Sequence, residues 1–256
     1  MEKGDRAAQK ARFQQRTEDQ LRKSLNIYKK VLKIDPDNKY SLSRLSLGYY
    51  LLAEAYLDYD EKEGAYQKGF DYGVKSLQTN PDFRQLHDEK GFAALKNLPK
   101  SVDNVPGLVW TAGNLAMMAR TQGILDSLDS LPALVELNER AIDLGDGYLA
   151  AAAHNALGCI SSEVLRKQPF TIWQVYNNGF SWKKTRGHFE RATELAPEYL
   201  GHYFSYAHYY ALNKDKEKLA KNLLEKVVQE PLGDDYPLMN EIAKDKAEIV
   251  LNRLSN

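Results

Sequence analysis

The residues of this chain that could ligate a metal ion or act as a nucleophile are few and widely spaced. His202 and His208 are six residues apart. On one helix they point in different directions and cannot share a metal ion as an i, i+4 pair can. We expect hydrogen-bonded or half-exposed rings at both positions. The single cysteine, Cys159, lies in "NALGCISS" without an adjacent histidine or cation, which favours a packed thiol over a nucleophile.

Signatures of catalytic sites are missing from the sequence. It contains no GxxxxGK phosphate loop, HExxH metal helix, GxSxG elbow or GxGxxG turn. Carboxylates such as Glu54, Asp58 and Glu136 could act as general acids or bases, but nothing in their spacing separates them from solvated helix faces. The sequence therefore predicts a protein that is not an enzyme and that uses no cofactor and no metal ion.

The composition narrows the class of protein further. The 256 residues are 43% hydrophobic, enough for a substantial core, and 35 Lys and Arg balance 35 Asp and Glu. Without an excess of positive charge we expect no binding to nucleic acid. No apolar run approaches the roughly 18 residues of a membrane span, and the N-terminus has no hydrophobic signal core. The protein is therefore expected to be cytoplasmic or to have lost a targeting segment.

Helices must position all of these side chains. Aromatic residues recur at helical spacing, and no sustained alternation of apolar and polar residues indicates strands. Residues 167–180 form the longest irregular connection, which we expect to be a loop pinned by Phe170, Trp173 and Phe180. The fold is predicted to be all-α, with about eleven helices near 7–34, 39–58, 61–79, 83–96, 104–121, 131–144, 148–165, 182–196, 198–213, 215–230 and 236–254.

A repeated pattern suggests how these helices pair. Thr185, Phe189, Ala192 and Pro197 are spaced by 4, 3 and 5 residues, the small, aromatic, small, proline order of the second helix of a tetratricopeptide-like unit. Small residues let two antiparallel helices approach, the ring fills the wedge beyond them, and proline ends the helix. The same frame recurs with substitutions at Ser24, Tyr28, Val31 and Pro36, at Gly69, Gly73, Ser76 and Pro81, and, without the proline, at Ala220, Leu224 and Val227.

We therefore expect degenerate tetratricopeptide-like hairpins that form a compact solenoid or bundle. The prediction is a single domain over residues 1–256, with an N-terminal half at 7–122 and a C-terminal half at 124–256.

In such arrays the first helix of each hairpin lines the concave side. Gly48 and Gly158 mark the crossing points of two first helices, and Gly113 and Tyr209 take the same place by analogy. Residues three before, one after and four after each crossing point then face inward. The ten candidate ligand contacts are Leu45, Tyr49, Leu52, Trp110, Asn114, Met117, Asn155, Cys159, Tyr206 and Tyr210, and Ser162 and Asn213 complete the inward set.

Two interpretations of this set stay open. Six of the eight residues 203–210 carry rings, counting histidine, and rings with polar tips suit the wall of a cavity or pore. They would equally well fill the space between helices. If a wall exists, its mostly apolar character favours a hydrophobic or lipid-like ligand over a sugar or nucleotide.

Three stretches together resemble one family. They are "VPGLVWTAGNLAMMAR" at 105–120, "SWKKTRGHFERATELAPEYLGHYFSYAHYYALNKDKEKLAKNLLEKVVQEP" at 181–231, and "PLMNEIAKDKAEIVLNRL" at 237–254. In the same order they look like the T-component (TatT-like) proteins associated with tripartite ATP-independent periplasmic (TRAP) transporters. The likeness spans residues 20–254, and no single motif carries it. Where the family is expected to have a second tryptophan, this chain has Asn114.

The resemblance implies an all-α bundle with a central, largely hydrophobic pore. It also implies a non-catalytic periplasmic lipoprotein that docks the substrate-binding P-component of the transporter, often as a homotrimer, and handles a hydrophobic small molecule or lipid. This sequence has no lipobox cysteine, since Cys159 is in mid-helix. We interpret Met1 as a start that replaces a removed leader, and a cytoplasmic relative would look the same.

A second class of function competes with the first. A cytoplasmic tetratricopeptide adaptor would hold an extended peptide of a partner in its concave groove. Such grooves usually carry lysine, arginine and asparagine, whereas the inward set has no charged residue. An enzyme with an unrecognised site is the third class, and no converging acid, base or nucleophile supports it.

Overall fold

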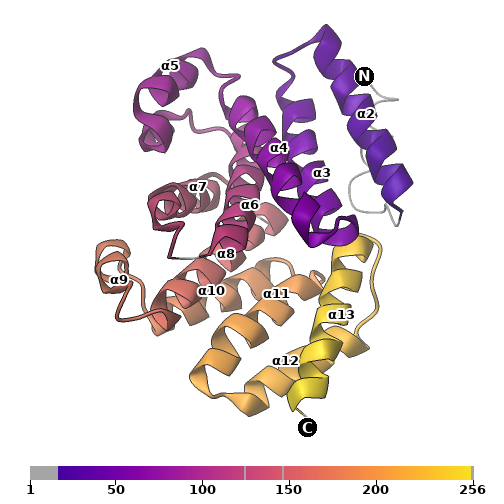
Figure 1. Cartoon of the computed structure of the whole chain (residues 1–256), viewed down its shortest axis with the longest axis vertical. Coiled ribbons are helices and arrows are strands. Elements are labelled where there is room, and N and C mark those ends of the chain that lie inside the picture. Colours follow the sequence, from indigo (N-terminus) through magenta and orange to yellow (C-terminus); the bar gives the residue numbers. More distant parts are fainter. Residues whose placement is uncertain (1–16, 124, 146, 255–256) are drawn as a thin grey trace. The chain divides into compact units, whose positions relative to one another are not determined.

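The computed structural model of the chain describes residues 17–123, 125–145 and 147–254. Every regular element in these ranges is helical, which confirms the predicted all-α fold (Figure 1). The described residues fall into two compact units, 17–145 and 147–254, and each is described here by itself. The helix expected from residue 7 has its first ten residues outside the described ranges. That the whole chain forms one domain stays a prediction.

The unit of residues 17–145 contains six α-helices and three short 3₁₀ helices. In chain order they are α2 (Glu18–Ile34), α3 (Lys39–Tyr56), α4 (Tyr59–Leu77), α5 (Pro81–Lys90), η1 (Gly91–Asn97), η2 (Val102–Asn104), α6 (Val105–Gln122), η3 (Leu128–Ser130) and α7 (Leu131–Leu144). The helix expected at 83–96 is two elements, because Gly91 has φ 59° and ends α5.

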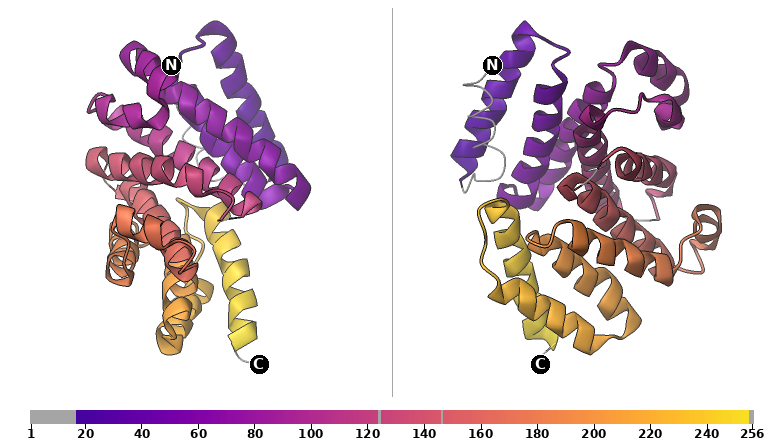
Figure 2. Two further views of the ribbon diagram at one scale, coloured as in Figure 1. Left: turned by 60° about the vertical axis from the view of Figure 1, so that its left-hand side comes forward. Right: turned by 180° about the vertical axis from the view of Figure 1, so that it is seen from behind.

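The unit of residues 147–254 contains six α-helices, a π-helix and a 3₁₀ turn (Figure 2). They are α8 (Gly147–Arg166), α9 (Ile172–Asn178), α10 (Trp182–Leu195), α11 (Leu200–Ser205), the π-helix η4 (Tyr206–Ala211), η5 (Leu212–Lys214), α12 (Glu217–Gln229) and α13 (Pro237–Leu254). The predicted helix at 198–213 is therefore present, but its residues 206–211 are wound as a π-helix.

Side-chain caps fix where several helices begin. The Asn38 side chain accepts a hydrogen bond from the Ser41 amide at the start of α3, and Asn80 does the same for Phe83 at the start of α5. At the start of α10 the Ser181 hydroxyl accepts from the Lys184 amide. These bonds satisfy amides that have no partner inside the helix, so the polar residues between the apolar runs set the register of the hairpins.

Small residues bring the paired helices together as the repeat frame predicts. A Cβ added at Gly48 on α3 would lie 2.5 Å from a methyl group of Leu25 on α2. One added at Gly158 on α8 would lie 2.8 Å from the Phe189 ring on α10. Both glycines are therefore close crossing points. Gly113 is not, because its nearest neighbour is the Tyr50 ring at an ordinary 3.7 Å.

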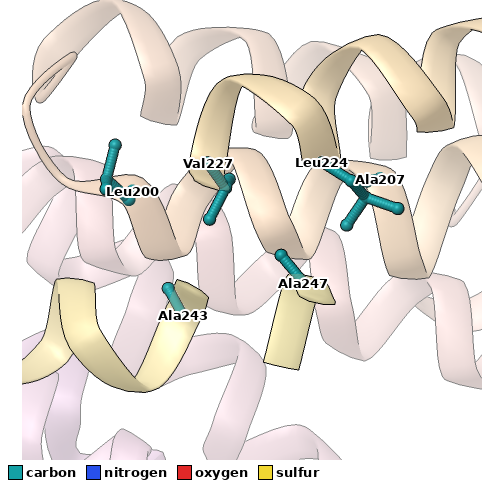
Figure 3. Close-up of a cluster of buried hydrophobic side chains, with 6 residues drawn as sticks. All are labelled: Leu200, Ala207, Leu224, Val227, Ala243 and Ala247. Carbon is teal, nitrogen blue, oxygen red and sulfur yellow. The ribbon is translucent and has the colours of Figure 1, made fainter. Parts of the chain in front are cut away.

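A small apolar core holds the C-terminal helices (Figure 3). Its buried members come from α11, the π-helix, α12 and α13: Leu200, Ala207, Leu224, Val227, Ala243 and Ala247. Beside it the buried Asn240 of α13 accepts from the Leu200 amide at 2.9 Å and donates to the Glu198 and Leu232 oxygens at 3.0 and 2.7 Å. One amide thus ties α13 to the start of α11.

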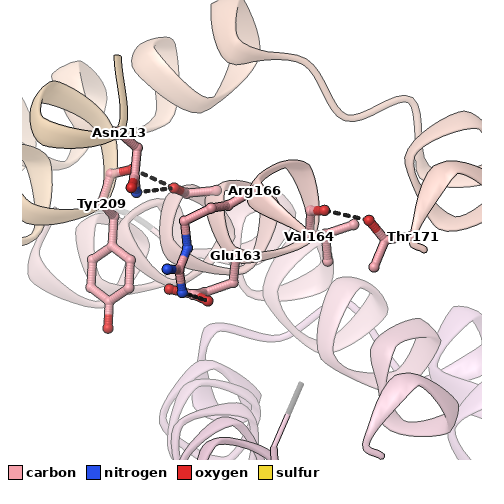
Figure 4. Close-up of polar contacts among 7 residues, drawn as sticks. Glu163, Val164, Arg166, Thr171, Tyr209 and Asn213 are labelled. Atoms are coloured by element: carbon pink, nitrogen blue, oxygen red, sulfur yellow. Dashed lines mark hydrogen bonds and ion pairs between the residues drawn. The ribbon is translucent and has the colours of Figure 1, made fainter. Parts of the chain in front are cut away.

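The connection at 167–180 differs from the prediction. It contains the short helix α9, and its base is anchored by the buried Thr171, whose hydroxyl donates to the Val164 oxygen at 2.5 Å (Figure 4). Phe170 and Trp173 do not pin it, because they are 77% and 68% exposed. The expectation that Phe170 and Trp173 hold this segment down was therefore wrong, whereas Phe180 is half-buried. The apolar residues of a stretch indicate an apolar face but not whether another element covers it.

Candidate functional site

The ten candidate ligand contacts are divided between the two units. Leu45, Tyr49 and Leu52 on α3 and Trp110, Asn114 and Met117 on α6 belong to residues 17–145, and Asn155 and Cys159 on α8 with Tyr206 and Tyr210 on the π-helix belong to residues 147–254. Within the first unit, Leu45 and Leu52 are buried and Met117 is half-buried.

Asn114 lies buried where α6 crosses α3 and α4. Its Nδ2 donates to the backbone oxygens of Trp110 at 2.7 Å and Ser46 at 3.2 Å. A Cβ at Gly69 of α4 would lie 2.3 Å from its Oδ1, so the amide fits only because position 69 is a glycine. Oδ1 has no hydrogen-bond partner among the described residues. Asn114 therefore locks three helices together.

Aromatic rings surround this crossing. The Trp110 ring lies 5.6 Å from the Tyr50 ring, and Tyr50 lies 6.2 Å from Tyr66, all between ring centroids. The Tyr66 hydroxyl donates to Glu54 Oε1 at 2.6 Å, and burial together with the Glu54 carboxylate raises the pKa of Tyr66. The polar tip of Tyr66 is thus held by a hydrogen bond while the three rings pack against one another.

Tyr49 has a different environment, rich in cations. Its ring stacks on Tyr72 at 5.8 Å with an interplanar angle of 10°. The ammonium groups of Lys29 and Lys68 lie 5.4 and 6.0 Å from its centroid, within the range of cation–π attraction. Sequence reasoning missed both lysines because they come from α2 and α4, helices not expected to face the wall.

The second unit gathers three of its four candidates in one cluster. Tyr206 and Tyr210 are buried with Phe189 of α10, and the half-buried Cys159 and Trp182 pack against them. Tyr206 stacks on Phe189 at 5.6 Å and 14°, and its ring centroid is 5.6 Å from that of Tyr210. We call these five residues the ring cluster. Cys159, Tyr206 and Tyr210 thus lie together, and that they contact a ligand stays a prediction.

Both tyrosine hydroxyls of the ring cluster reach charged groups. The Tyr206 hydroxyl donates to Glu190 Oε1 at 3.3 Å, and Lys216 Nζ donates to the Tyr210 hydroxyl at 3.2 Å. Burial and the Glu190 carboxylate raise the pKa of Tyr206. The cluster is therefore apolar in its body, with its phenol groups held at a charged rim.

The π-helix is fastened by two further members of the inward set. Asn213 Nδ2 donates to the Tyr209 oxygen at 2.8 Å and to Ser162 Oγ at 3.3 Å, and Ser162 Oγ itself donates to the same Tyr209 oxygen (Figure 4). Ser162 and Asn213 thus serve the backbone of the π-helix. π-Helical turns are rare and occur frequently at functional sites.

Asn155 of α8 differs from Ser162 and Asn213, because its buried Oδ1 has no hydrogen-bond partner among the described residues.

The histidines are arranged in a way that sequence spacing did not reveal. His154 on α8 and His188 on α10 meet with their Nδ1 atoms 2.9 Å apart. Burial and the neighbouring His188 and Arg191 lower the pKa of His154 to about 4. One neutral ring must donate to the other, which requires two different tautomers. The sequence feature that could have indicated this contact is the pairing of α8 with α10, which brings His154 and His188 to the same helix interface.

His202 contradicts its prediction. It is 1% exposed and neither ring nitrogen has a hydrogen-bond partner among the described residues, so it is neither hydrogen-bonded nor half-exposed. Burial lowers its pKa to about 3, because a charged imidazole would lose its hydration. Its ring lies 4.5 Å from that of Tyr199 and is neutral at physiological pH.

No converging group of metal ligands occurs in the described part of the chain. In the same ranges, no helix is both long and apolar enough to cross a lipid bilayer. The chemistry that the two ring-rich regions offer is the contact of apolar and aromatic faces with an apolar molecule, oriented by a few polar tips.

Comparison with known proteins places this geometry in a family. The model of the family described as TRAP transporter T-component matches residues 17–256. A comparison with curated proteins found no match.

Proposed function

The chain belongs to the TRAP transporter T-component family, and from this premise we propose that it binds a hydrophobic or lipid-like ligand in the central pore that the family resemblance implies. Its role as an accessory component of a TRAP-type transporter follows from the family. The observation that supports ligand binding is the ring cluster, in which stacked apolar faces end in phenol groups at a charged rim.

We propose two different roles for the ten candidate ligand contacts. Tyr49, Trp110, Met117, Asn155, Cys159, Tyr206 and Tyr210 are proposed as ligand contacts. Leu45, Leu52 and Asn114 are at most 3% exposed, whereas the buried contacts Tyr49, Trp110, Tyr206 and Tyr210 are 5% to 8% exposed. We propose that the three less exposed residues hold the contact residues in place from behind. The unpartnered Oδ1 of Asn155 would accept a hydrogen bond from a hydroxyl or amide of the ligand.

We further propose that the protein docks the substrate-binding P-component, assembles as a homotrimer and works in the periplasm with a lipid anchor. These proposals rest on the family alone. Light scattering of the purified protein, with and without a TRAP P-component, tests both assemblies. A monomer that leaves the P-component unbound would contradict them.

Native mass spectrometry tests the ligand site. Protein purified from its own host is sprayed intact and then extracted with organic solvent, and we expect a co-purifying apolar molecule. Tyr206→Leu should lower its occupancy because the hydroxyl that reaches Glu190 is lost. Tyr203→Leu is the matched control, because Tyr203 lies three residues earlier and packs on the C-terminal core instead. Equal occupancy in both variants, or an empty wild-type protein, would contradict the proposal.

One observation favours a second candidate function. Lys29 and Lys68 beside the ring of Tyr49 form a cationic, aromatic surface that suits a carboxylate of a peptide. In this alternative the protein is a tetratricopeptide adaptor for an acidic partner peptide. Binding of an acidic peptide that is lost in Lys29→Gln/Lys68→Gln, with no apolar molecule extracted, would favour the adaptor.

A further inference from the structure

The short helix α9 and the turn before it carry four large apolar side chains that the fold leaves uncovered. Phe170, Ile172, Trp173 and Tyr176 are 77%, 62%, 68% and 81% exposed. Ile172, Trp173 and Tyr176 are spaced i, i+1 and i+4, which places them on one side of the helix. Exposed apolar patches of this kind mark interaction sites.

The exposure is built into the fold. Thr171 is buried and bonded to Val164, the Val175 amide donates to the Thr171 oxygen at 3.0 Å, and Asn178 Nδ2 donates to the Gln174 oxygen at 2.9 Å. The Trp173 and Tyr176 rings stack with centroids 6.5 Å apart. The backbone is thus satisfied and the rings face solvent. Figure 1 shows α9 standing out from α8 and α10, and so does the right-hand view of Figure 2.

The sequence around this tip is rich in positive charge. Residues 164–189 include five basic residues, Arg166, Lys167, Lys183, Lys184 and Arg186, and no acidic residue, although the whole chain has a net charge of 0. The Lys184 ammonium lies beside the end of α9, 3.1 Å from where a Cβ on Gly179 would be. Arg166 and Arg186 are paired with Glu163 and Glu190, which flank this stretch. Within the described residues Lys167, Lys183 and Lys184 take part in no ion pair, and we expect them to attract an outside anion.

We propose that the α9 tip is a docking site for the surface of an anionic lipid bilayer. Tryptophan and tyrosine prefer the depth of the lipid headgroups, with one end dry and the other hydrated. Phenylalanine and isoleucine insert slightly deeper, and lysines beside them attract the phosphates of acidic lipids. Exposed rings that project from the fold and are flanked by lysines suit a fluid lipid surface better than the rigid groove of a protein partner.

The insertion is shallow and reversible. Four side chains on a short helix and the turn before it cannot span a bilayer, so binding depends on apolar contact and on charge together. The proposal does not rest on the ligand site: Tyr206→Leu should bind vesicles as wild type does, so the failure of one proposal is distinguishable from the failure of the other.

Flotation of the full chain with vesicles tests the proposal. Vesicles of equal parts phosphatidylglycerol and phosphatidylcholine should bind the protein, and vesicles of phosphatidylcholine alone should bind it weakly. Trp173→Ser/Tyr176→Ser should weaken binding to the anionic vesicles by about tenfold or more, and Lys183→Gln/Lys184→Gln should weaken it and reduce its salt dependence. Tyr59→Ser, which changes an equally exposed ring in the other unit, is the matched control and should bind normally.

A fluorescence measurement distinguishes insertion of Trp173 into the bilayer from nonspecific adsorption of the protein to vesicles. Brominated lipids should quench the tryptophan fluorescence of the wild type, and Trp173→Phe should keep the binding and lose most of the quenching. Failure to bind anionic vesicles, or undiminished binding by Trp173→Ser/Tyr176→Ser, would overturn the proposal. Loss of P-component binding in that double variant, without any vesicle binding, would assign the tip to a protein partner and would also overturn it.

Discussion

The two units solve the same packing problem differently. In residues 17–145, the helices α3, α4 and α6 meet through small residues and short polar side chains, so that Gly73 touches Thr111 and Ser46, and Gly69 touches Asn114. In residues 147–254, α8 and α10 meet through an aromatic ring, since Gly158 touches Phe189. The first contact leaves little room to adjust, and the second leads directly into the ring cluster. The difference suggests a rigid crossing in one unit and an adaptable one in the other.

The largest loss of stability should come from a substitution at the rigid crossing of α4 and α6. A Cβ at Gly73 would lie 2.3 Å from Thr111 Oγ1 and 3.1 Å from the Thr111 Cα, which is backbone and cannot rotate away. We expect Gly73→Ala to lower the free energy of unfolding by about 3 kcal/mol. Urea unfolding measures it. Gly64→Ala in the same helix meets nothing within 4 Å and should stabilise the protein by ~0.5 kcal/mol. Equal effects of the two changes would refute the close crossing.

The crossing of α8 and α10 at Gly158 should lose less stability when a methyl group is added. At Gly158 the nearest atoms are the edge of the Phe189 ring, at 2.8 to 3.0 Å. The ring can shift, so we expect Gly158→Ala to cost about 2 kcal/mol. Gly187→Ala on α10, where nothing lies within 4 Å, is the control in the same unfolding assay. If Gly158→Ala proves as costly as Gly73→Ala, the contrast between the two units is wrong.

A pH effect should distinguish the second unit. The folded pKa of His202 is about 3, below the roughly 6.5 of an unfolded histidine. As the pH falls, the unfolded chain takes up the proton first. The stability is thus complete above pH 6.5 and is lost as the pH falls from there toward 3. Between pH 6.5 and 5.5 this histidine alone should lower the free energy of unfolding by about 1 kcal/mol.

Unfolding of His202→Phe measures this contribution, because phenylalanine keeps the ring contact with Tyr199 and does not titrate. The variant should lose less stability than wild type over the same pH interval. His154 and His188 titrate in both proteins and cancel in the comparison. An identical loss in the two proteins would show that His202 takes no part in the acid response.

The smallest effect should come from the rim of the ring cluster. Tyr206→Phe removes the hydroxyl that donates to Glu190 at 3.3 Å and keeps the stack on Phe189. Because the bond is long and Glu190 is partly exposed, we expect a loss of about 0.5 kcal/mol in thermal unfolding. Tyr203→Phe serves as the control on the same helical stretch. A loss above that of Gly158→Ala would mean that the rim, and not the ring faces, stabilises the cluster.

Much of the fold could be predicted because helical periodicity is a local property. The hairpins follow from the spacing of small, aromatic and proline residues, and the crossing points at Gly48 and Gly158 were found in this way. Gly113 was not a crossing point, because the analogy that assigned it ignored which neighbour α6 meets. α6 approaches α4 closely through Gly107, where a Cβ would lie 2.3 Å from Ser76 Oγ.

The candidate site was predictable only in part. Spacing on α8 and the π-helix gave Cys159, Tyr206 and Tyr210, which do share one cluster. Spacing also gave Asn114, whose burial depends on Gly69 of another helix. Phe170 and Trp173 were expected to be covered but are exposed, because their sequence alone is compatible with either a core or a surface.

The sequence by itself determined the all-helical fold, the pairing of helices and the family, since each depends on the order of residue types along the chain. Only the tertiary structure decided which polar groups are satisfied and which rings are covered. His154 and His188 meet, His202 is left without a hydrogen-bond partner among the described residues, and Trp173 faces solvent. These outcomes depend on residues far apart in the chain, and burial and hydrogen bonding are properties of the neighbours that the fold supplies.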